Sequence, residues 1–582
     1  MKTPLRLLFV LISLKLAAQP FQKNGGEQTL YYHDLNIDII NDNSNNFIMA
    51  GNVFDVNFAT QIMTLHRKDQ FGTTVWAHNY SDISLPVIRV LDVVNYLDKV
   101  YATGYVEVNG PTTRSIFIAD ISASTGLVNS ANFYDILTPP MNSEGLKIIF
   151  TNSDADGDLV QDPGFVVGGI FTSCPTTDST CPTNLGFVLR TDLALNPLWV
   201  IEMDNNNSPN GTFDYDFING VTETPTGFFL TGSVVGNAVA GTPDQQGVLA
   251  HYIDFQGNFL WDSSYIFGNS QDVSVDAYFD ATSQHIFMLC NYSQTHYFGV
   301  TELDLSGNII PSGSWYVTNS DLNSYGFKLT ESITNTANLM ISGYDRDENW
   351  QDTNGNPVTG QSNIFVYEFN KATGAQTSPY TQYLVSHIEH SPEEFNFWSL
   401  QMPLIYYPDM SYQYMNNDGT GTHYYHVGYR TIPSNETWPE YIATDATLAN
   451  NCIHLNKPLT LNPLQYTPIS AISGFVPYNF GPITITANPR TVADRDCDDT
   501  ILAVSTPESK TLRLFPNPAK NALYLSSEVS VEYALFDMAG RILETGKVSK
   551  TQSVDVSKFP VGIYLLRIEI ENSIQMLRFI KE

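Results

Sequence analysis

The chain has 582 residues, of which 42% are hydrophobic and 12% aromatic, and its formal net charge at pH 7 is −32. Such an acidic protein repels nucleic acid and anionic lipid, so we expect neither as a partner. The charge suits Ca²⁺, cationic ligands or neutral glycans, and it is also compatible with solubility alone. Five cysteines in a chain of this length do not indicate a disulfide-rich scaffold.

The N-terminus has the features of an export signal. A basic start with Lys2 and Arg6 precedes a short apolar run, and small residues follow before the chain becomes polar. The apolar run is shorter than the about 20 residues that a membrane-spanning helix requires. We therefore predict that residues 1–19 are a signal peptide, cleaved after Ala18 or Gln19. No later segment reaches transmembrane length.

The central region, residues 20–460, repeats a unit made of strands. In each unit an apolar strand ends at a small residue and is followed by a polar loop, a second strand, a tight turn and a third strand. The seven copies end, in order, at Gly51, Gly104, Gly169, Gly232, Cys290, Gly343 and Gly428. Neighbouring copies are about 53 to 65 residues apart, except for a spacing of 85 where a long insertion precedes the last copy. A repeat of this kind without helical periodicity is typical of a β-propeller. We therefore predict an all-β fold with a seven-bladed β-propeller.

Several copies also share a hairpin in which aspartate, glycine and tryptophan recur at fixed spacing. The clearest examples are Asp69, Gly72 and Trp76 in the first copy and Asp254, Gly257 and Trp261 in the fourth, with weaker versions at Asp192 to Trp199 and Asp304 to Gly307. The aspartate can accept hydrogen bonds from the turn backbone, and glycine supplies a positive φ. We expect the tryptophan to pack between adjacent blades. The spacing resembles the blade motif of quinoprotein-like propellers, which implies a fold but no activity.

Residues 461–507 are rich in proline and polar residues. We expect them to return over the propeller and then to form a linker. Residues 20–46 are expected to add an outer strand to the last blade.

Residues 508–582 contain short strands of alternating apolar residues separated by turn residues, which is typical of a small β-sandwich. The motif residues are, in order, Pro516, Asn517, Pro518, Asp537, Gly540, Arg541, Gly562, Tyr564 and Lys581. This region resembles the type A C-terminal sorting domain of the type IX (Por) secretion system of Bacteroidetes. The resemblance implies an Ig-like sandwich, recognition by the type IX machinery, and a secreted or outer-membrane surface protein from which the domain is removed.

One loop has the side chains of a calcium site. The candidate ligands are Asn152, Asp154, Asp156, Asp158 and Asp162, around a glycine that permits a sharp bend. Alternating oxygen side chains suit Ca²⁺, and the loop resembles the calcium loops of integrin-type propellers. Val160 and Pro163 occupy positions where an EF-hand has ligands, so that set is incomplete. The alternative is an Asx-rich turn that binds nothing; a bound Ca²⁺ would have a structural role.

Two pairs of cysteines could form disulfide bonds after export. Cys174 and Cys181 bracket a short loop, and Cys452 and Cys497 form the second expected pair. Cys290 lies in an apolar run, which predicts a buried free thiol.

Catalytic motifs are absent from the sequence. It contains no GxSxG, P-loop or GxGxxG after a strand. The late histidines are interpreted as surface or packing residues and not as a transition-metal site; they are His387, His390, His423 and His426. Tyrosines between residues 406 and 425 could form a sugar-binding face, but we favour packing between blades.

These observations together favour a non-catalytic binding module for a glycan or a protein. The alternatives are a polysaccharide-active hydrolase or lyase, whose residues would come from many blades, and a scaffold of a surface assembly.

Overall fold

The computed structural model describes residues 21–24, 33–384, 414–416, 423–496 and 514–582, apart from short gaps within these ranges. The described residues are almost entirely β-strands and turns, with one short 3-10 helix, η1 (Pro311–Gly313). The prediction of an all-β protein is therefore confirmed. None of the described helices could cross a membrane. The chain divides into two compact units, Met1–Asp498 and Asp499–Glu582.

The first unit is built from successive groups of four strands, each paired antiparallel with its neighbour in the chain. One 15-stranded sheet contains two consecutive groups and a third made from both ends of the unit. These strands are β2 (His33–Asn41), β3 (Phe47–Phe54), β4 (Gln61–Lys68) and β5 (Thr74–Ser81); β6 (Val87–Tyr96), β7 (Lys99–Glu107), β8 (Arg114–Ser122) and β9 (Val128–Ile136); and β28 (Tyr414–Asn416), β29 (His423–Thr431), β30 (Thr437–Asp445) and β1 (Phe21–Asn24).

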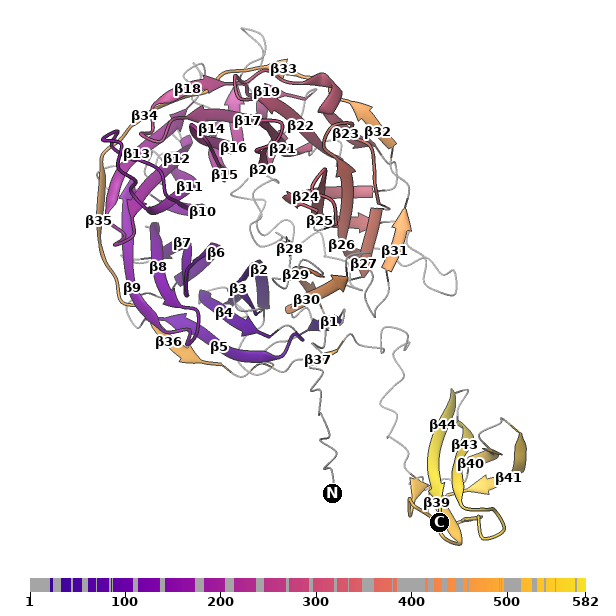
Figure 1. Cartoon of the computed structure of the whole chain (residues 1–582). Coiled ribbons are helices and arrows are strands. Elements are labelled where there is room, and N and C mark those ends of the chain that lie inside the picture. Colours follow the sequence, from indigo (N-terminus) through magenta and orange to yellow (C-terminus); the bar gives the residue numbers. More distant parts are fainter. Residues whose placement is uncertain are drawn as a thin grey trace, which may run out of the picture. The chain divides into compact units, whose positions relative to one another are not determined.

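Four further sheets continue the same pattern. Their strands are β10 (Ser143–Thr151), β11 (Gly164–Thr172), β12 (Thr183–Asp192), β13 (Pro197–Asp204) and β14 (Asp214–Tyr215); β15 (Phe217–Thr224), β16 (Gly227–Gly236), β17 (Gln245–Ile253), β18 (Phe259–Asp262) and β19 (Tyr265–Ile266); β20 (Asp272–Asp280), β21 (His285–Tyr292), β22 (Tyr297–Asp304) and β23 (Trp315–Thr318); and β24 (Leu322–Glu331), β25 (Asn338–Asp347), β26 (Gln361–Asn370) and β27 (Tyr380–Leu384). Figure 1 shows that the groups follow one another around a common centre, with β2, β6, β10, β15, β20 and β24 innermost.

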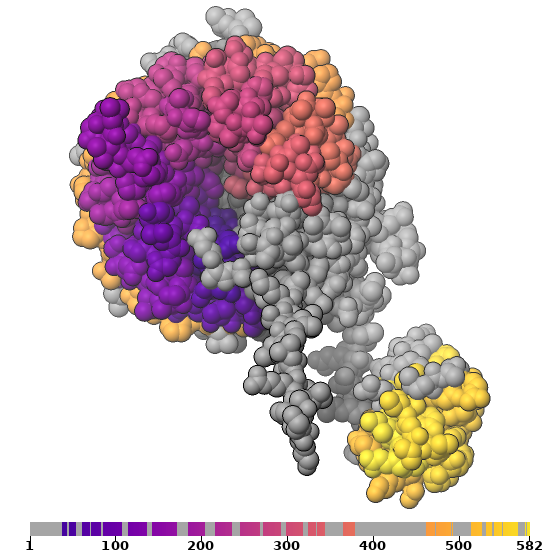
Figure 2. Space-filling view, viewed as in Figure 1, coloured from indigo at the N-terminus to yellow at the C-terminus, as the bar shows by residue number. Residues whose placement is uncertain are grey.

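The return segment, residues 454–496, adds one outer strand to each group. Its strands are β31 (His454–Lys457) on β27, β32 (Thr460–Pro463) on β23, β33 (Thr467–Pro468) on β19, β34 (Ile472–Phe475) on β13, β35 (Tyr478–Pro482) on β9, β36 (Thr486–Pro489) on β5 and β37 (Arg495–Asp496) on β1. Strands β31 to β36 follow the first six groups in reverse order, and β37 joins the group of β28 to β30. All of these pairs are antiparallel. In Figure 2 the orange atoms of this segment lie along the rim, outside the purple and magenta sheets. At the N-terminus, β1 also pairs antiparallel with β30.

Prolines recur through the return segment. Four of its strands end in proline, at Pro463, Pro468, Pro482 and Pro489, and Pro477 lies between two strands. Proline has no backbone N–H, so it cannot donate to a further strand. Each of these prolines therefore removes one donor from an outer edge, which makes pairing with another chain less favourable there.

The core of the first unit lies between successive groups and not within one of them. Trp199, Leu230 and Leu249 come from three strands of two adjacent sheets, and Ile469 of the return segment belongs to the same buried cluster. Each sheet thus buries its faces against its neighbours, which supplies the main favourable term in folding.

The second unit consists of two small sheets around one core. The first sheet contains β38 (Leu514–Phe515), β39 (Ala522–Leu525) and β42 (Val554–Asp555); the second contains β41 (Ile542–Val548), β40 (Val531–Asp537), β43 (Gly562–Ile570) and β44 (Ser573–Lys581). Leu523, Leu535 and Leu566 are fully buried in the shared core.

Candidate functional sites

The C-terminal motif residues of the second unit hold its last strand in place. Asn517 Oδ1 accepts a hydrogen bond of 2.9 Å from the backbone N–H of Ile580. Beyond it, the Ala519 N–H donates to the Ile580 carbonyl oxygen at 2.8 Å, and the Glu582 N–H donates to the Ala519 carbonyl oxygen at 3.0 Å. The Pro516-Asn517-Pro518 sequence therefore fastens the C-terminal end of β44.

The second motif pair closes the turn between β40 and β41. Asp537 Oδ1 accepts the backbone N–H of Arg541 at 3.0 Å, and Asp537 Oδ2 accepts Arg541 Nε at 2.8 Å. In addition, the Asp537 N–H donates a hydrogen bond of 3.1 Å to the Arg541 carbonyl oxygen. Gly540 lies outside the described residues.

The remaining motif residues join β43 to β44. Tyr564 donates its hydroxyl proton to the Pro560 carbonyl oxygen at 2.8 Å, and its ring stacks on Phe579 with the centroids 5.6 Å apart. Gly562 lies opposite Lys581 across the two strands, and Lys581 is buried. The described motif residues thus make contacts inside the domain.

Comparison with known families identifies this unit. Residues 513–582 match the model of the secretion system C-terminal sorting domain. The chain carries a type IX sorting domain. The protein is therefore a type IX secretion cargo that interacts with the secretion machinery and is secreted or displayed at the cell surface.

Two other comparisons concern more of the chain than the sorting domain. No curated protein matches the chain. One similar solved structure is the phage phi92 endosialidase, at 11% sequence identity and a TM-score of 0.32, covering 73% of this chain and 69% of that one. A likeness this weak supports no argument about activity.

The two edges of the first unit's sheets carry connections of different length. The connection from β7 to β8 runs from Glu107 to Arg114, that from β11 to β12 runs from Thr172 to Thr183, and that from β25 to β26 runs from Asp347 to Gln361. Antiparallel strands place these connections, and those leading to the next group, at one edge. We call this the loop-bearing edge and the opposite one the turn edge. Residues 385–413, which include several of the tyrosines noted above, lie outside the described residues.

The turn edge is closed by the aspartate–glycine hairpins. Asp254 Oδ1 accepts the backbone N–H groups of Gln256 at 3.0 Å and Asn258 at 2.7 Å, and Gly257 has a φ of 84°. Asp69, Asp192 and Asp304 cap their turns in the same way. A small polar side chain that bonds to the backbone and a residue with positive φ are what such turns require.

The tryptophans of these hairpins bind the next group, as their spacing predicts. Trp76 Nε1 donates to the Ala123 carbonyl oxygen at 3.1 Å, and Trp261 Nε1 donates to the Leu305 carbonyl oxygen at 3.0 Å. A Cβ added at Gly307 would lie 2.7 Å from the Trp261 ring. Each ring therefore rests on the turn of the following group.

The predicted calcium loop lies between β10 and β11 on the turn edge. Asp154, Asp156 and Asp162 each offer a carboxylate oxygen within 4.8 Å of the others. Asp158 lies outside this group and accepts the Val160 N–H, while Asn152 donates to Gln161. Burial slightly opposes ionisation, but backbone N–H groups, led by that of Gly157, lower the pKa of Asp154. The loop therefore presents three gathered carboxylates, of which Asp154 favours its charged form.

A ring of charged residues, which the sequence interpretation missed, occupies the innermost strands. Asp38, Asp92, Lys147, Asp276 and Lys328 each lie just after a bulge in the pairing of these strands. A charged residue inside an otherwise apolar strand is a signal that the sequence does contain. That these five residues lie near one another, however, depends on how the sheets are arranged.

The bonds of this ring run between neighbouring groups. Asp92 accepts the Ile148 N–H at 2.7 Å and binds Lys147 Nζ at 2.9 Å, and Asp276 accepts the Leu329 N–H at 2.8 Å. Burial raises the pKa of Asp92 to about 7, against the opposing effect of Lys147. Because both oxygens of Asp92 have partners on the next sheet, we infer that the ring has a structural role and holds neighbouring groups together.

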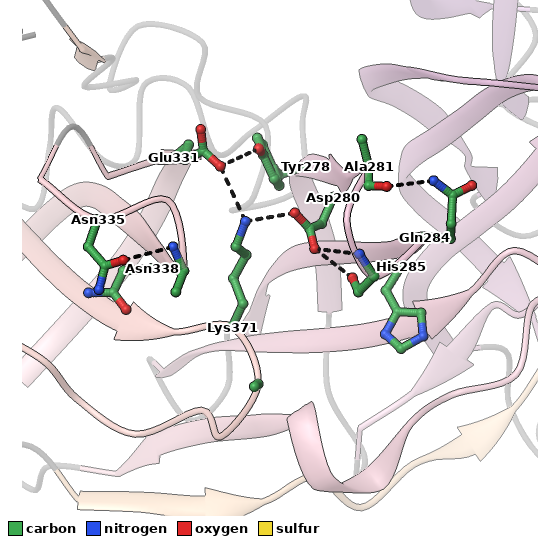
Figure 3. Close-up of polar contacts among 12 residues, drawn as sticks. Tyr278, Asp280, Ala281, Gln284, His285, Glu331, Asn335, Asn338 and Lys371 are labelled. Atoms are coloured by element: carbon green, nitrogen blue, oxygen red, sulfur yellow. Dashed lines mark hydrogen bonds and ion pairs between the residues drawn. The ribbon is translucent and has the colours of Figure 1, made fainter.

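A second buried charge cluster joins the sheets of β20 and β24 at the turn edge (Figure 3). Lys371 Nζ lies 2.7 Å from Asp280 Oδ1 and 3.2 Å from Glu331 Oε1. Tyr278 donates its hydroxyl proton to Glu331 at 3.0 Å, and Ser283 donates from both its N–H and its hydroxyl to Asp280 Oδ2. One lysine thus neutralises carboxylates from two different sheets.

Of the remaining residues singled out in the sequence, three are described and six are not. Cys290 is a buried free thiol, as predicted, and its Sγ lies 3.4 Å from the Tyr265 hydroxyl. Burial raises the pKa of Cys290 to about 12, so the thiol is unreactive at neutral pH. His423 and His426 lie on β29. The predicted residues that lie outside the described part of the chain are Cys174, Cys181, Cys452, Cys497, His387 and His390.

Proposed function

We propose that the exported protein is a seven-bladed β-propeller followed by an Ig-like sorting domain, and that the propeller is a non-catalytic binding module. Three four-strand groups of the 15-stranded sheet and four further sheets make seven groups among the described residues. Antiparallel groups of four strands arranged around one centre are the architecture of a propeller. Residues 1–19 would be removed as a signal peptide.

The difference between the two edges is the observation that carries the binding function. The turn edge is closed by short hairpins whose aspartates are bonded to their own turns. The connection from β25 to β26 and most other connections within the groups that vary in length belong to the loop-bearing edge, where a rigid scaffold can present variable loops to a ligand. The long connections of the turn edge are that of the predicted calcium loop, between β10 and β11, and that between β22 and β23. The net charge of −32 favours neutral glycans or proteins over anionic polymers.

A glycan array probed with the chain from residue 20 onward tests this function. We expect saturable binding to neutral glycans. Replacing residues 348–360 on the loop-bearing edge by a short Gly-Ser linker should weaken binding, whereas Asn258→Gly on the turn edge should leave it unchanged. A blank array from a folded protein would refute the glycan ligand and leave a protein partner, sought by crosslinking at the cell surface.

We also propose that Asp154, Asp156 and Asp162 bind a structural Ca²⁺. Three carboxylates whose oxygens lie within 4.8 Å of one another form the oxygen-rich donor set that this ion prefers. Thermal unfolding in Ca²⁺ and in chelator tests the site: Ca²⁺ should raise the Tm, and Asp156→Asn should abolish the increase. Asp158→Asn is the matched control and should retain it. Equal Tm values for the wild-type chain in both conditions would refute the proposal.

A further inference from the structure

The second sheet of the sorting domain has one apolar face directed outward. Along β40 and β43, Tyr533, Leu535, Leu566 and Ile568 point into the core. Because side chains alternate along a strand, their neighbours Phe536, Ile563 and Leu565 point outward. The pairing of the strands then places Ile542 beside Phe536, Phe536 beside Leu565, and Ile563 beside Ile580.

This outer apolar face consists of Phe536, Ile542, Ile563, Leu565 and Ile580. Ile542 is 61% exposed, Ile563 43% and Ile580 41%. Val561 is 78% exposed and lies two residues before Ile563. Large β-branched side chains that remain in water on one continuous sheet face are typical of an interaction surface.

The sorting motif itself does not offer such a surface. Asn517 is bonded to β44, Asp537 closes its turn with Arg541, and Tyr564 packs against Phe579. These residues explain why the domain folds, and the exposed ones, residues 516–518 and Arg541, lie outside the apolar sheet face. The apolar sheet face is therefore a second surface, beside the exposed motif residues, that a machine recognising the folded domain can contact.

We propose that the outer apolar face is the surface through which the type IX secretion machinery binds the folded sorting domain. The proposal is independent of the function of the first unit. The partner is expected to offer an apolar surface with an acidic group near Arg541, whose side chain is 79% exposed at one end of the face. The sorting region from residue 512 has nine basic and eight acidic residues, so attraction by net charge contributes little.

The small area of the outer apolar face favours the secretion machinery as its partner over a second copy of the chain. A stable dimer buries about 800 Å² and some 20 to 30 residues on each side. Five side chains cover only a fraction of that area. A surface of this size fits transient recognition, as a cargo that must be released requires.

The test uses the full chain in a bacterium that has the type IX system. The variant Ile542→Thr/Ile563→Thr/Ile580→Thr keeps β-branched residues in the strands but removes most of the exposed apolar surface. We expect the exported fraction, measured by immunoblots of medium, cell surface and periplasm, to fall about tenfold or more. Folded chain should accumulate in the periplasm, and an unchanged Tm of the purified variant would exclude misfolding.

A matched control replaces an exposed ion pair of the same domain. Glu532→Thr/Lys547→Thr removes side chains that are 78% and 59% exposed, and export should remain at the wild-type level. If the triple variant loses stability, Ile542→Thr alone is the second variant, because Ile542 is the most exposed of the three isoleucines. Wild-type export by the triple variant would overturn the proposal. So would a concentration-dependent dimer in ultracentrifugation that the triple variant abolishes without any change in export.

Discussion

Replacing Lys371 by methionine tests whether the charge cluster of Figure 3 fastens two sheets together. The change preserves most of the apolar stem but leaves Asp280, which is 5% exposed, without its cation. Removing one partner of a buried pair costs about 3 to 5 kcal/mol. We expect the lower end, about 3 kcal/mol, because Ser283 still donates two hydrogen bonds to Asp280.

Amide hydrogen exchange in peptides covering β20 and β24 measures this local cost. A loss of about 3 kcal/mol corresponds to exchange about 150-fold faster, since each tenfold change is about 1.4 kcal/mol. The control is Lys99→Met, whose partner Asp120 lies at the same distance of 2.7 Å but whose side chain is 39% exposed. That variant should change exchange by less than about fivefold.

The double variant Lys371→Met/Asp280→Asn separates the ion pair from simple packing. Removing the second charge should restore most of the lost protection, because no buried carboxylate is then left without a cation. Exchange as fast in the double variant as in Lys371→Met alone would refute the reasoning. So would no change in Lys371→Met.

The pH dependence of the same cluster has a defined sign. Burial alone would raise the pKa of Asp280, but Lys371 and then Ser283 outweigh it and hold the pKa below its ordinary value. A lowered carboxyl pKa adds stability above the unfolded pKa of about 3.9, and this stability is lost as the pH falls through the folded pKa. The acid-induced increase in exchange at β20 should therefore be smaller in Lys371→Met.

Three further substitutions test the turn edge and the sorting motif. Trp199→Ala removes a ring that is 7% exposed and should lower the free energy of unfolding by about 3 to 5 kcal/mol in a urea titration, whereas Trp199→Phe should cost less. Gly307→Ala places a side chain at a φ of 83° and 2.7 Å from Trp261; we expect a loss of about 1 to 2 kcal/mol or more by the same titration, against no loss for Ser306→Ala. Asn517→Ala removes the acceptor of the Ile580 N–H and should cost about 1 kcal/mol, seen as faster exchange of the β44 amides; unchanged exchange would contradict the role assigned to the motif.

The sequence supported the all-β class and the sorting domain because both are encoded locally. Alternating apolar residues define the strands, and the Asp–Gly turns fix where the hairpins reverse. The contact of Trp261 with the next group also followed from its position directly after such a turn. Each of these features was predicted from residues that are close together in the chain, although the Trp261 contact itself spans 44 residues.

The charged ring and the Lys371 cluster could not be read from the sequence, because their partners are far apart in it. Lys371 and Asp280 are 91 residues apart, and Lys147 and Asp92 are 55 apart. Nothing near Lys371 marks it as buried, and an isolated lysine after a strand is usually exposed. For the predicted calcium loop, sequence reasoning yielded too many candidates and not too few. The local pattern selected five candidate ligands, but only the folded loop shows that the carboxylates of Asp154, Asp156 and Asp162 lie close together while that of Asp158 lies outside this group.

The order in which the return strands pair with the groups could not be predicted from local sequence patterns either. Asn488 Nδ2 donates to Ser81 Oγ across 407 residues of sequence, and β31 to β36 reach the other groups in the order opposite to their synthesis. Contacts of such separation form late, because the intervening chain must be ordered first. Until they form, the outermost strand of each group is an open sheet edge. The return strands then pair with these edges, and the proline that ends four of them removes one N–H from the new edge, which makes pairing with a further strand less favourable. The segment that completes the first unit also lies directly before the sorting region, so a chain that reaches the export machinery with its edges covered has folded all the preceding groups.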